Sequence, residues 1–400
     1  MTTPTLEADP ACPDVELELP RATTIRLRAE RRAFDDIPQQ TWDAMAARNP
    51  WAPPFSAWAF HRAWRDAYGE NAHEQTIVVL DPDRSVAEPV GIVPLMHRHF
   101  VEPRDAETHT TIRHGAELPL TSVAPDAKTI FFGASYHADY ATILGAPADL
   151  PAIADALVAG FASEQPIDPD HPMDWDVIDL RRLKCGDPTA ATLAAAFGAR
   201  EMRAGWAMNL EREDVCPVAA IPAGIDFDGY LATLTKHHRH EIRRKVRRAL
   251  AVGEITLIDS TDPVADLEVF IEMHQRKWGD EGLFPATPGG DQSRIFLRRL
   301  FELFGLGGPL RLSFLHVGER RVGASIQFET PETLYFYNAG IDPDARRLSP
   351  GVLLVERLLR RAIERGLRRF DFMRGDEPYK YEWGATDEPI QRLLVRQGIG

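Results

Sequence analysis

The same order of predicted elements occurs twice in the chain. Residues 75–98, QTIVVLDPDRSVAEPVGIVPLMHR, and residues 310–329, LRLSFLHVGERRVGASIQFE, each contain two predicted strands joined by a polar turn. In both segments the second strand opens near a Val-Gly pair. Helices precede each hairpin, and a strand–helix–strand unit follows it. This internal similarity predicts two copies of one α/β fold.

The length of 400 residues and the hydrophobic fraction of 44% suit two domains, each with its own core. Residues 1–22 are acidic and rich in proline, so we expect a disordered tail there. Residues 211–226 follow neither the helical nor the strand period and contain two prolines. We therefore predict a linker at 211–226, between an N-terminal domain at 23–210 and a C-terminal domain at 227–400.

The balance of charge limits the partners that the protein can have. The formal net charge is −14, which disfavours general attraction to DNA or to acidic membranes. No run of about 18 apolar residues occurs, so we expect no membrane span. The first residues lack the basic and apolar regions of a signal peptide. We expect a cytoplasmic protein with no DNA partner.

The most informative segment is the strand, loop, helix and strand at residues 334–373. Ser349 is predicted as the N-cap of the helix, with Pro350 at its first position. The free N–H groups of such a helix start suit a phosphate, and Arg346 and Arg347 just before it would add charge. The alternative is an ordinary capped helix that follows a solvated arginine pair.

A basic segment, KHHRHEIRRKVRRAL, occupies residues 236–250 of this acidic chain. It holds seven Lys or Arg residues against one acid, Glu241. Such a local field can hold an anionic substrate, a nucleotide phosphate or RNA, and the alternative is a solvated helix face. His237, His238 and His240 lack the spacing of metal ligands, so no metal site is predicted.

Reactive and aromatic side chains crowd together just after a predicted buried strand, in residues 369–384, RFDFMRGDEPYKYEWG. A solvated loop has no need of so many aromatic groups. A carboxylate can act as a general base for an amine or hydroxyl, a cation can stabilise a developing oxyanion, and a phenol can donate a proton to a leaving group. The candidates are Asp376 and Glu377 as the base, Lys380 as the oxyanion stabiliser, and Tyr379 or Tyr381 as the proton donor.

A structural explanation of the same segment stays open. Asp371 and Asp376 would then pair with Arg369 and Arg374, and Trp383 would fill the edge of a core. The sequence also lacks the Gly-x-Gly-x-x-Gly, Walker, Gly-x-Ser-x-Gly and His-Glu-x-x-His motifs. Dehydrogenase, NTPase, serine hydrolase and zinc protease functions lose their main support.

The order of these parts resembles the GNAT acyltransferases. The segments RHEIRRKVRRALAVG, FIEMHQRKWG, LSPGVLLVERLLRRAIERGLRRFDFMRGDEPYKYEWG and NPWAPPFSAWAFHRAW look more narrowly like the CelD-like branch, named for a link to cellulose biosynthesis. That branch is similar to the Fem-type peptidyltransferases, which carry two tandem GNAT domains. The resemblance covers most of residues 40–395. It implies an α/β (α+β) fold of two tandem GNAT-like domains, each a mixed twisted sheet flanked by helices.

The resemblance also implies where the ligands bind. The acyl donor would lie where the sheet splays between residues 334–341 and 367–373, and RRLSPG would replace the glycine-rich loop that holds coenzyme A. Lys380 matches a lysine that is thought to stabilise acyl transfer in Fem-type relatives. The expected cofactor contacts are Arg346, Arg347, Ser349, Gly351 and Asn338. The expected contacts of the acceptor are Arg239, Arg243, Trp278, Trp383 and Tyr381.

The leading hypothesis is a GNAT-type N-acyltransferase that uses acetyl-CoA or another acyl-CoA and no metal. Its acceptor would be an amine or hydroxyl of a small molecule, a sugar or a cell-envelope precursor. One alternative is a Fem-type transferase that uses aminoacyl-tRNA bound by the basic segment. The other is a catalytically inert binding module in a polysaccharide-synthesis assembly.

Overall fold

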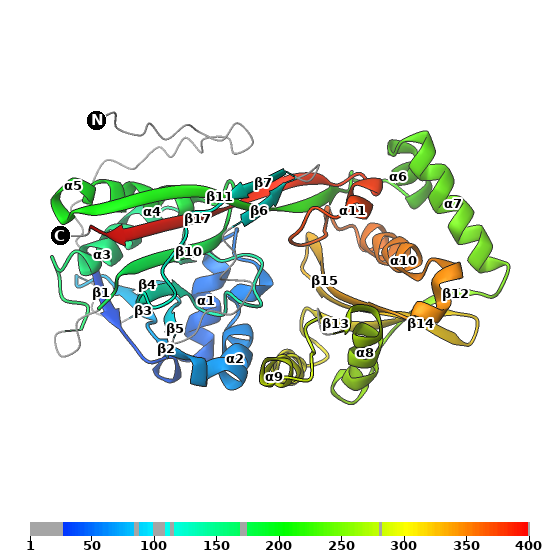
Figure 1. Ribbon diagram of the computed structural model, residues 1–400, viewed down its shortest axis with the longest axis horizontal. Helices are drawn as coiled ribbons and strands as arrows, with labels where there is room; N and C mark the ends of the chain where they lie inside the picture. Colours follow the sequence, from blue (N-terminus) through cyan, green and yellow to red (C-terminus); the bar gives the residue numbers. More distant parts are fainter. Residues whose placement is uncertain are drawn as a thin grey trace. The chain divides into compact units, whose positions relative to one another are not determined.

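The computed structural model describes residues 27–83, 88–98, 109–112, 116–168, 174–279 and 282–398. The predicted disordered tail at 1–22 lies outside this part of the chain. The chain forms two compact units (Figure 1). Unit 1 comprises Met1–Val215 and Glu388–Gly400, and unit 2 comprises Cys216–Asp387.

Unit 1 contains a hairpin followed by a strand–helix–strand crossover. Its elements are β3 (Ile77–Leu80), β4 (Pro89–Val93), β5 (Leu95–Arg98), β8 (Thr129–Phe132), α3 (Leu150–Phe161) and β10 (Val177–Lys184). β3 pairs antiparallel with β4, and β5 pairs antiparallel with β8. The chain then crosses through α3 to β10, which lies parallel to β8 with Val177 opposite Thr129.

Unit 2 repeats this order of pairing. Its elements are β13 (Leu310–Val317), β14 (Arg320–Glu329), β15 (Thr333–Ile341), α10 (Pro350–Glu364) and β16 (Arg369–Asp371). The β13–β14 hairpin is antiparallel, β14 pairs antiparallel with β15, and the chain crosses through α10 to β16, which is parallel to β15. The prediction of two copies of one α/β fold is confirmed.

The helices before each hairpin also match the sequence pattern. In unit 1, α1 (Gln39–Arg48) and α2 (Trp58–Tyr68) are separated around Pro53 and Pro54, because proline does not continue a helix. In unit 2, the helices before the hairpin include α6 (Phe227–Thr233) and α7 (Lys236–Leu250), which follow each other with a break at residues 234–235. The break arises because Thr235 caps the second helix: its side chain accepts a hydrogen bond from His238 N at 3.2 Å.

The predicted linker at 211–226 differs from the structure. β11 (Trp206–Ala220) runs through most of it, and the boundary between the units falls within this strand. A further strand, β17 (Thr386–Gln397), was not predicted, and its residues from Glu388 onward belong to unit 1, where β17 pairs antiparallel with β10. The strand period of β11 is hidden because acidic residues such as Glu213 are buried in it beside arginines.

The remaining elements are shorter or flank the two sheets. They are β1 (Arg28–Arg31), β2 (Ala72–Glu74), β6 (His109–Ile112), β7 (Ala116–Pro119), β9 (Leu144–Gly145), α4 (Pro188–Gly198), α5 (Glu201–Ala204), β12 (Ile255–Asp259), α8 (Pro263–Trp278), α9 (Pro288–Phe304) and α11 (Pro378–Glu382). Among the described residues, no helix has the length and apolar character needed to cross a membrane.

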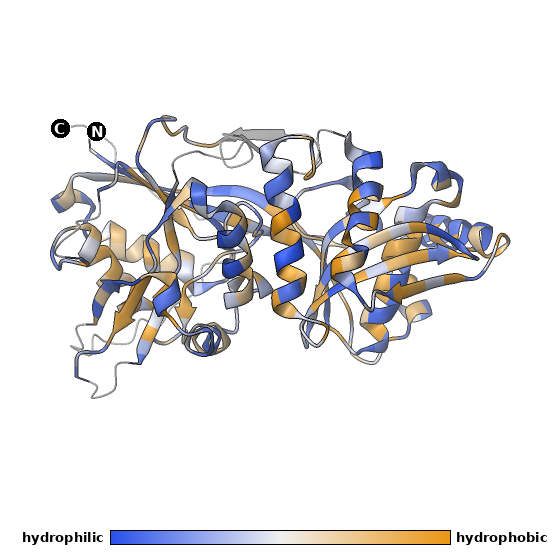
Figure 2. Ribbon diagram, turned by 90° about the horizontal axis from the view of Figure 1, so that it is seen from below, coloured by the Kyte–Doolittle hydropathy of each residue, from blue (hydrophilic) through white to orange (hydrophobic). Residues whose placement is uncertain are grey.

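The core of each unit forms between its helices and its sheet. In unit 2, α10 buries the apolar face that the sequence predicts, and Leu354, Leu358 and Leu359 are fully buried. Figure 2 shows this pattern as helices with hydrophobic residues on one side and hydrophilic residues on the other. Burial of that face fixes the position of the helix start, which bears on the site described below.

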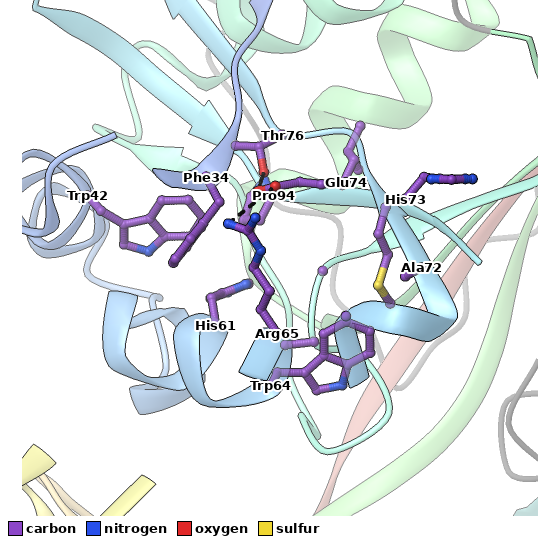
Figure 3. A pocket seen from close by; sticks show the side chains of 15 residues that line it. Phe34, Trp42, His61, Trp64, Arg65, Ala72, His73, Glu74, Thr76 and Pro94 are labelled. Atoms are coloured by element: carbon purple, nitrogen blue, oxygen red, sulfur yellow. Dashed lines mark hydrogen bonds and ion pairs between the residues drawn. The ribbon is translucent and has the colours of Figure 1, made fainter. Parts of the chain in front are cut away.

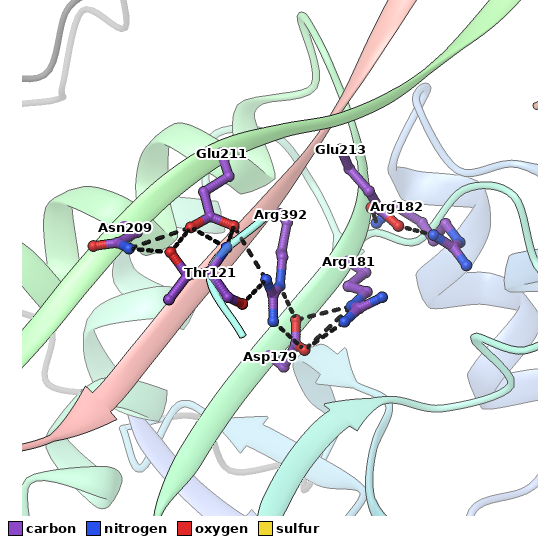
Figure 4. A network of polar contacts seen from close by, with 8 residues as sticks. All are labelled: Thr121, Asp179, Arg181, Arg182, Asn209, Glu211, Glu213 and Arg392. Carbon is purple, nitrogen blue, oxygen red and sulfur yellow. Dashed lines mark hydrogen bonds and ion pairs between the residues drawn. The ribbon is translucent and has the colours of Figure 1, made fainter. Parts of the chain in front are cut away.

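Unit 1 also buries a network of charged side chains (Figure 4). Arg392 of β17 forms a bidentate ion pair with Asp179 of β10, with Nε–Oδ1 at 2.7 Å and Nη2–Oδ2 at 2.8 Å. Arg181 also donates to Asp179, and Arg392 Nη1 donates to Glu211 Oε2 at 3.1 Å. Burial raises the pKa of the Asp179 carboxyl, but the two arginines outweigh burial and hold that pKa below its usual value. The last strand of the chain is thereby tied to the first unit.

Replacing Arg392 with methionine tests this tie. Arg392→Met leaves the buried Asp179 with Arg181 as its one remaining guanidinium partner in the described network, which we expect to cost about 3–5 kcal/mol. The free energy of opening of β10, measured by hydrogen exchange in the full chain, should fall by that amount. Arg396→Met, on the same strand but half-buried, is the matched control. Equal exchange in the two variants would contradict the role of Arg392.

Candidate active site

The parallel pairing of β15 and β16 ends early in unit 2. Only Thr333–Tyr335 pair with Arg369–Asp371, after which β15 continues to Ile341 while β16 ends. A register shift in the β14–β15 ladder lies beside the same stretch. The two strands therefore part at their carboxyl ends, which is the edge of an open α/β sheet where ligands bind. This confirms the predicted splay of the sheet.

The start of α10 lies at the same edge, because the chain leaves the carboxyl end of β15 through a short 3-10 turn, Pro343–Leu348, and enters α10. Ser349 occupies the N-cap position in the left-handed conformation, with φ 56° and ψ 55°, and its side chain makes no capping hydrogen bond. The predicted positions are confirmed, with Ser349 as the N-cap residue and Pro350 at the first helical position. The Ser349 side chain does not cap the helix, because its backbone is left-handed, whereas N-cap residues ordinarily adopt an extended conformation.

The hydroxyl of Ser349 instead accepts a hydrogen bond from Arg248 Nη2 at 2.7 Å. Arg248 comes from the last turn of α7, which contacts the 3-10 turn before α10. A Cβ built on Gly351 meets no atom within 4 Å, so the space in front of the first helical turn is open. Pro350 has no N–H, and the N–H groups of Val352 and Leu353 donate to the Ser349 carbonyl at 3.0 and 3.2 Å. The helix start therefore offers the N–H of Gly351, for which the described residues supply no acceptor, beside a guanidinium.

Two further cations precede this helix start. Arg346 and Arg347 are exposed in the 3-10 turn, and the structure shows no ion pair for either of them within the described part of unit 2. Three guanidiniums and the positive end of a helix dipole form a site suited to a phosphate or pyrophosphate. Sequence reasoning placed Arg346 and Arg347 here but missed Arg248. The basic character of α7 was the available signal, but its contact with Ser349 depends on tertiary structure.

The other predicted contacts are more distant from this helix start. Asn338 lies on β15, opposite Ile326, and its Oδ1 accepts a hydrogen bond from Ala339 N at 2.8 Å. Arg239 lies nine residues before Arg248 on α7, which is about 13 Å along the helix axis. Arg243 forms an ion pair with Asp228 at 3.0 Å. The structure does not bring Arg239 and Arg243 to the start of α10.

Lys380 holds the loop that follows β16. Its Nζ donates to three carbonyl oxygens, those of Met373, Arg374 and Gly375, at 2.9–3.0 Å, and forms an ion pair with Glu377 at 2.8 Å. The side chain is only 2% exposed. An ammonium has three N–H donors, so these carbonyls use all of them. This geometry does not support the predicted oxyanion role, and it makes Lys380 a residue that positions the loop.

The aromatic residues near Lys380 divide into core and surface. Trp383 is 1% exposed, and its carbonyl accepts a hydrogen bond from Tyr230 Oη at 2.6 Å. Its burial argues against the predicted contact with an acceptor and agrees with the core-edge alternative. Tyr381 Oη donates to Asp387 Oδ1 at 2.6 Å. Tyr379 is exposed, with its ring against Phe372.

Ionisable groups gather around the same loop. Although the Tyr379 ring is partly exposed, protein surrounds its hydroxyl, and this burial together with the charge of Glu377 raises the pKa of the phenol. The hydroxyl is a hydrogen-bond donor near neutral pH, as in an ordinary tyrosine. Asp376 is half-buried beside Glu377. Lys277 ends α8, with its Nζ 4.1 Å from the centre of the Trp278 ring. Sequence reasoning predicted Trp278 but missed the lysine.

Lys277 is a cation whose pKa the surrounding protein lowers, although the residue as a whole is exposed to solvent. Partial burial lowers the pKa of its ammonium, and the negative charge of Glu377 acts in the opposite direction and only in part offsets burial. An amine with a depressed pKa is a candidate proton acceptor in a site. The protein thus places a phenol with a raised pKa and an amine with a lowered pKa within electrostatic reach of Glu377. Across the described residues, no cluster of three or more His, Cys, Asp or Glu side chains is arranged to hold a metal.

Replacing Lys380 tests whether it positions the loop. Lys380→Met leaves three carbonyl groups without their donor, and we expect the free energy of unfolding to fall by about 2–4 kcal/mol. Thermal unfolding of the full chain measures this loss. Lys236→Met removes an exposed lysine of the same unit and serves as the control. An unchanged midpoint together with lost activity would instead favour the oxyanion role.

Comparisons with known proteins agree with this geometry. The family described as "Acetyltransferase (GNAT) domain" matches residues 236–381, which include α7, α10 and the loop held by Lys380. No curated protein matches the sequence significantly. The solved structure "Crystal structure of FemX" is 11% identical, with a TM-score of 0.55 over 91% of this chain and 96% of that one.

A second solved structure gives the same result. A conserved protein of unknown function from Bacteroides thetaiotaomicron is 14% identical, with a TM-score of 0.51 over 92% of this chain and 99% of that one. At such identities the likeness shows the fold alone, and it extends over both units. The predicted mixed α/β fold in two similar units is confirmed, and residues 236–381 match the model of a GNAT acetyltransferase domain.

Proposed function

We propose that the protein transfers an acyl group from acyl-CoA to an amine or hydroxyl of a small molecule, a sugar or an envelope precursor. The observation that carries the proposal is the start of α10, where no side chain caps the helix and Arg248 is bound to Ser349. Arg346 and Arg347 stand directly before it. This arrangement suits the pyrophosphate of coenzyme A.

The parting of β15 and β16 supplies room for the acyl end of the donor. A donor whose pyrophosphate rests on α10 can direct its pantetheine arm to the gap beyond Tyr335 and Asp371, where pairing has ended. The thioester carbonyl would then find backbone N–H groups of β15 that no longer belong to the parallel ladder. Such donors stabilise an oxyanion without a side-chain cation, which fits the engagement of Lys380 in its loop.

The loop around Glu377 supplies the proton transfers. The acceptor nitrogen or oxygen attacks the thioester carbon, a C–N or C–O bond forms, and the C–S bond breaks. Lys277 in its neutral form takes the proton of the acceptor, directly or through water, and Glu377 steadies the ammonium that forms. The Lys277 ammonium returns that proton to the departing thiolate, directly or through water, and the Tyr379 hydroxyl donates a hydrogen bond to the sulfur. Asp376 remains a second candidate for the base.

Binding of the donor tests this site directly. Acetyl-CoA and free coenzyme A should raise the melting temperature of the full chain with increasing concentration, because they bind the native state alone. Arg248→Ala should weaken binding about 10-fold or more, since a guanidinium–phosphate contact is charge-assisted. Arg298→Ala, which removes an exposed arginine of α9 paired with Glu268, is the control. If neither acetyl-CoA nor coenzyme A shifts the melting temperature of the wild type, the proposal is contradicted.

The proposed base predicts how the rate of the reaction depends on pH. Lys277 is active when neutral, so kcat/KM should rise with pH and level off at an apparent pKa below the usual 10.5 of lysine. Lys277→Arg cannot deprotonate in this range, so it should lower the rate about 10²–10⁴-fold and abolish that limb of the profile. Asp376→Asn is the comparison variant. If kcat/KM still rises with pH in Lys277→Arg but no longer does so in Asp376→Asn, the base is Asp376.

A Fem-type transferase that uses aminoacyl-tRNA is the second candidate. The exposed cations of α7 favour it: Lys236 and Arg247 have no ion-pair partner within the described residues, and the fold is similar to that of FemX. Charge reversal of Arg243 and Arg247 should then abolish a tRNA binding that weakens steeply with salt. Lack of any salt-dependent tRNA binding in the wild type would exclude it. The narrower CelD-like resemblance, and with it an inert module in polysaccharide synthesis, stays a prediction from sequence.

A further inference from the structure

Unit 1 holds a cavity of about 200 Å³ that the proposed reaction does not use. It lies between the 3-10 turn at Phe34–Asp36, helices α1 and α2, and strand β2 (Figure 3). Six of the residues that line the cavity determine its aromatic walls and its polar groups: Phe34, Trp42, His61, Trp64, Arg65 and Glu74. All of them belong to unit 1, and none lies in the GNAT domain match at residues 236–381.

Two tryptophans give the cavity flat apolar walls. Trp42 is fully buried, and its Nε1 already donates to the Ser56 carbonyl at 2.8 Å, so it offers only its ring. Trp64 is 5% exposed and stacks on Tyr68 with ring centres 5.4 Å apart. Its Nε1 is buried with no hydrogen-bond acceptor among the described residues. A buried indole N–H without a partner is costly unless a ligand or water satisfies it.

His61 gives the cavity a neutral polar group. Its ring lies 4.9 Å from the Trp42 ring, centre to centre, and burial lowers the pKa of the imidazole to about 3. The ring is therefore uncharged at neutral pH, with one nitrogen that donates and one that accepts. The described residues supply no hydrogen bond to either nitrogen. A Cβ at Gly133 would lie 3.2 Å from His61 Nδ1, so the glycine leaves room beside this nitrogen.

The charges at the rim already compensate one another. Arg65 Nη1 lies 3.0 Å from Asp35 Oδ2 and 3.7 Å from Glu74 Oε2, and Thr76 donates to Glu74 Oε1 at 3.1 Å. Burial raises the pKa of Glu74, which shows that the cavity disfavours charge. A charged ligand would lose its hydration here without gaining a free counter-ion. The cavity therefore disfavours a charged ligand.

We propose that this cavity is a second binding site, which takes a small uncharged ring compound bearing a hydroxyl or N–H group. The ring would pack against Trp42 and Trp64, and its polar group would hydrogen-bond to His61. A cavity of about 150 Å³ holds benzene, so 200 Å³ admits a ring with one or two substituents or a compact bicycle. The site is independent of the donor site in unit 2.

The test uses four probes of similar size with the full chain and no acyl donor present. Phenol and indole are neutral, whereas benzoate and benzylamine are charged at pH 7. We expect phenol and indole to raise the melting temperature and to change the tryptophan fluorescence along a single saturating binding curve. Their affinities should be at least about 10-fold higher than that of either charged probe. No response to any probe, or equal affinity for phenol and benzoate, would overturn the proposal.

Two variants locate the site. Ala72→Phe places a ring into the cavity from β2, at a half-buried position, and should abolish the response to phenol. His61→Phe keeps a ring but removes both nitrogens, and should weaken phenol at least about 5-fold while sparing toluene. Ala152→Phe adds the same side chain at a half-buried alanine of α3 outside the cavity. This variant should bind phenol as tightly as the wild type does. Undiminished phenol binding in Ala72→Phe or in His61→Phe would contradict the inference.

Discussion

The chemistry proposed for unit 2 depends on the early end of the parallel pairing between β15 and β16. Three residue pairs hold these strands together, after which they separate. The separation exposes backbone groups at the carboxyl ends, and the crossover brings the start of α10 to the same edge. Burial of the apolar face of α10 fixes that start in place. A helix dipole and three arginines then meet at this edge, and the loop held by Lys380 follows the carboxyl end of β16.

The two units share a topology but differ at this edge. After β15 the chain enters a 3-10 turn rich in arginine and then a helix whose first turn is uncapped. After β8 it reaches α3, whose N-cap position is Asp149, and an acidic residue there disfavours a phosphate. This difference leaves unit 2 suited to an anionic donor. Unit 1 has an aromatic cavity between α1, α2 and β2, for which we propose a neutral ligand.

Sequence reasoning succeeded where the pattern is local. The two hairpins, the crossover helices and the apolar face of α10 follow from period and from turn residues. It failed where a pattern is satisfied at long range. β11 looked like a linker because Glu211 and Glu213 interrupt its period, yet arginines distant in the sequence neutralise both acids. It also failed at Lys380 for a local reason, because the Nζ donates to three backbone carbonyls five to seven residues earlier and no sequence pattern signals such contacts. Lys277 and Arg248 became visible as site residues only through tertiary contacts.

The central claim is that an acyl-CoA rests on the start of α10 beside Arg248. Hydrogen exchange of the full chain with and without acetyl-CoA tests it most directly, because a bound pyrophosphate should protect the N–H of Gly351 and slow the opening of the first helical turn. The account predicts slower exchange in peptides that cover Arg346–Leu353 and the last turn of α7, with unit 1 unchanged. Unaltered exchange in these peptides at saturating acetyl-CoA, or protection confined to unit 1, would contradict it.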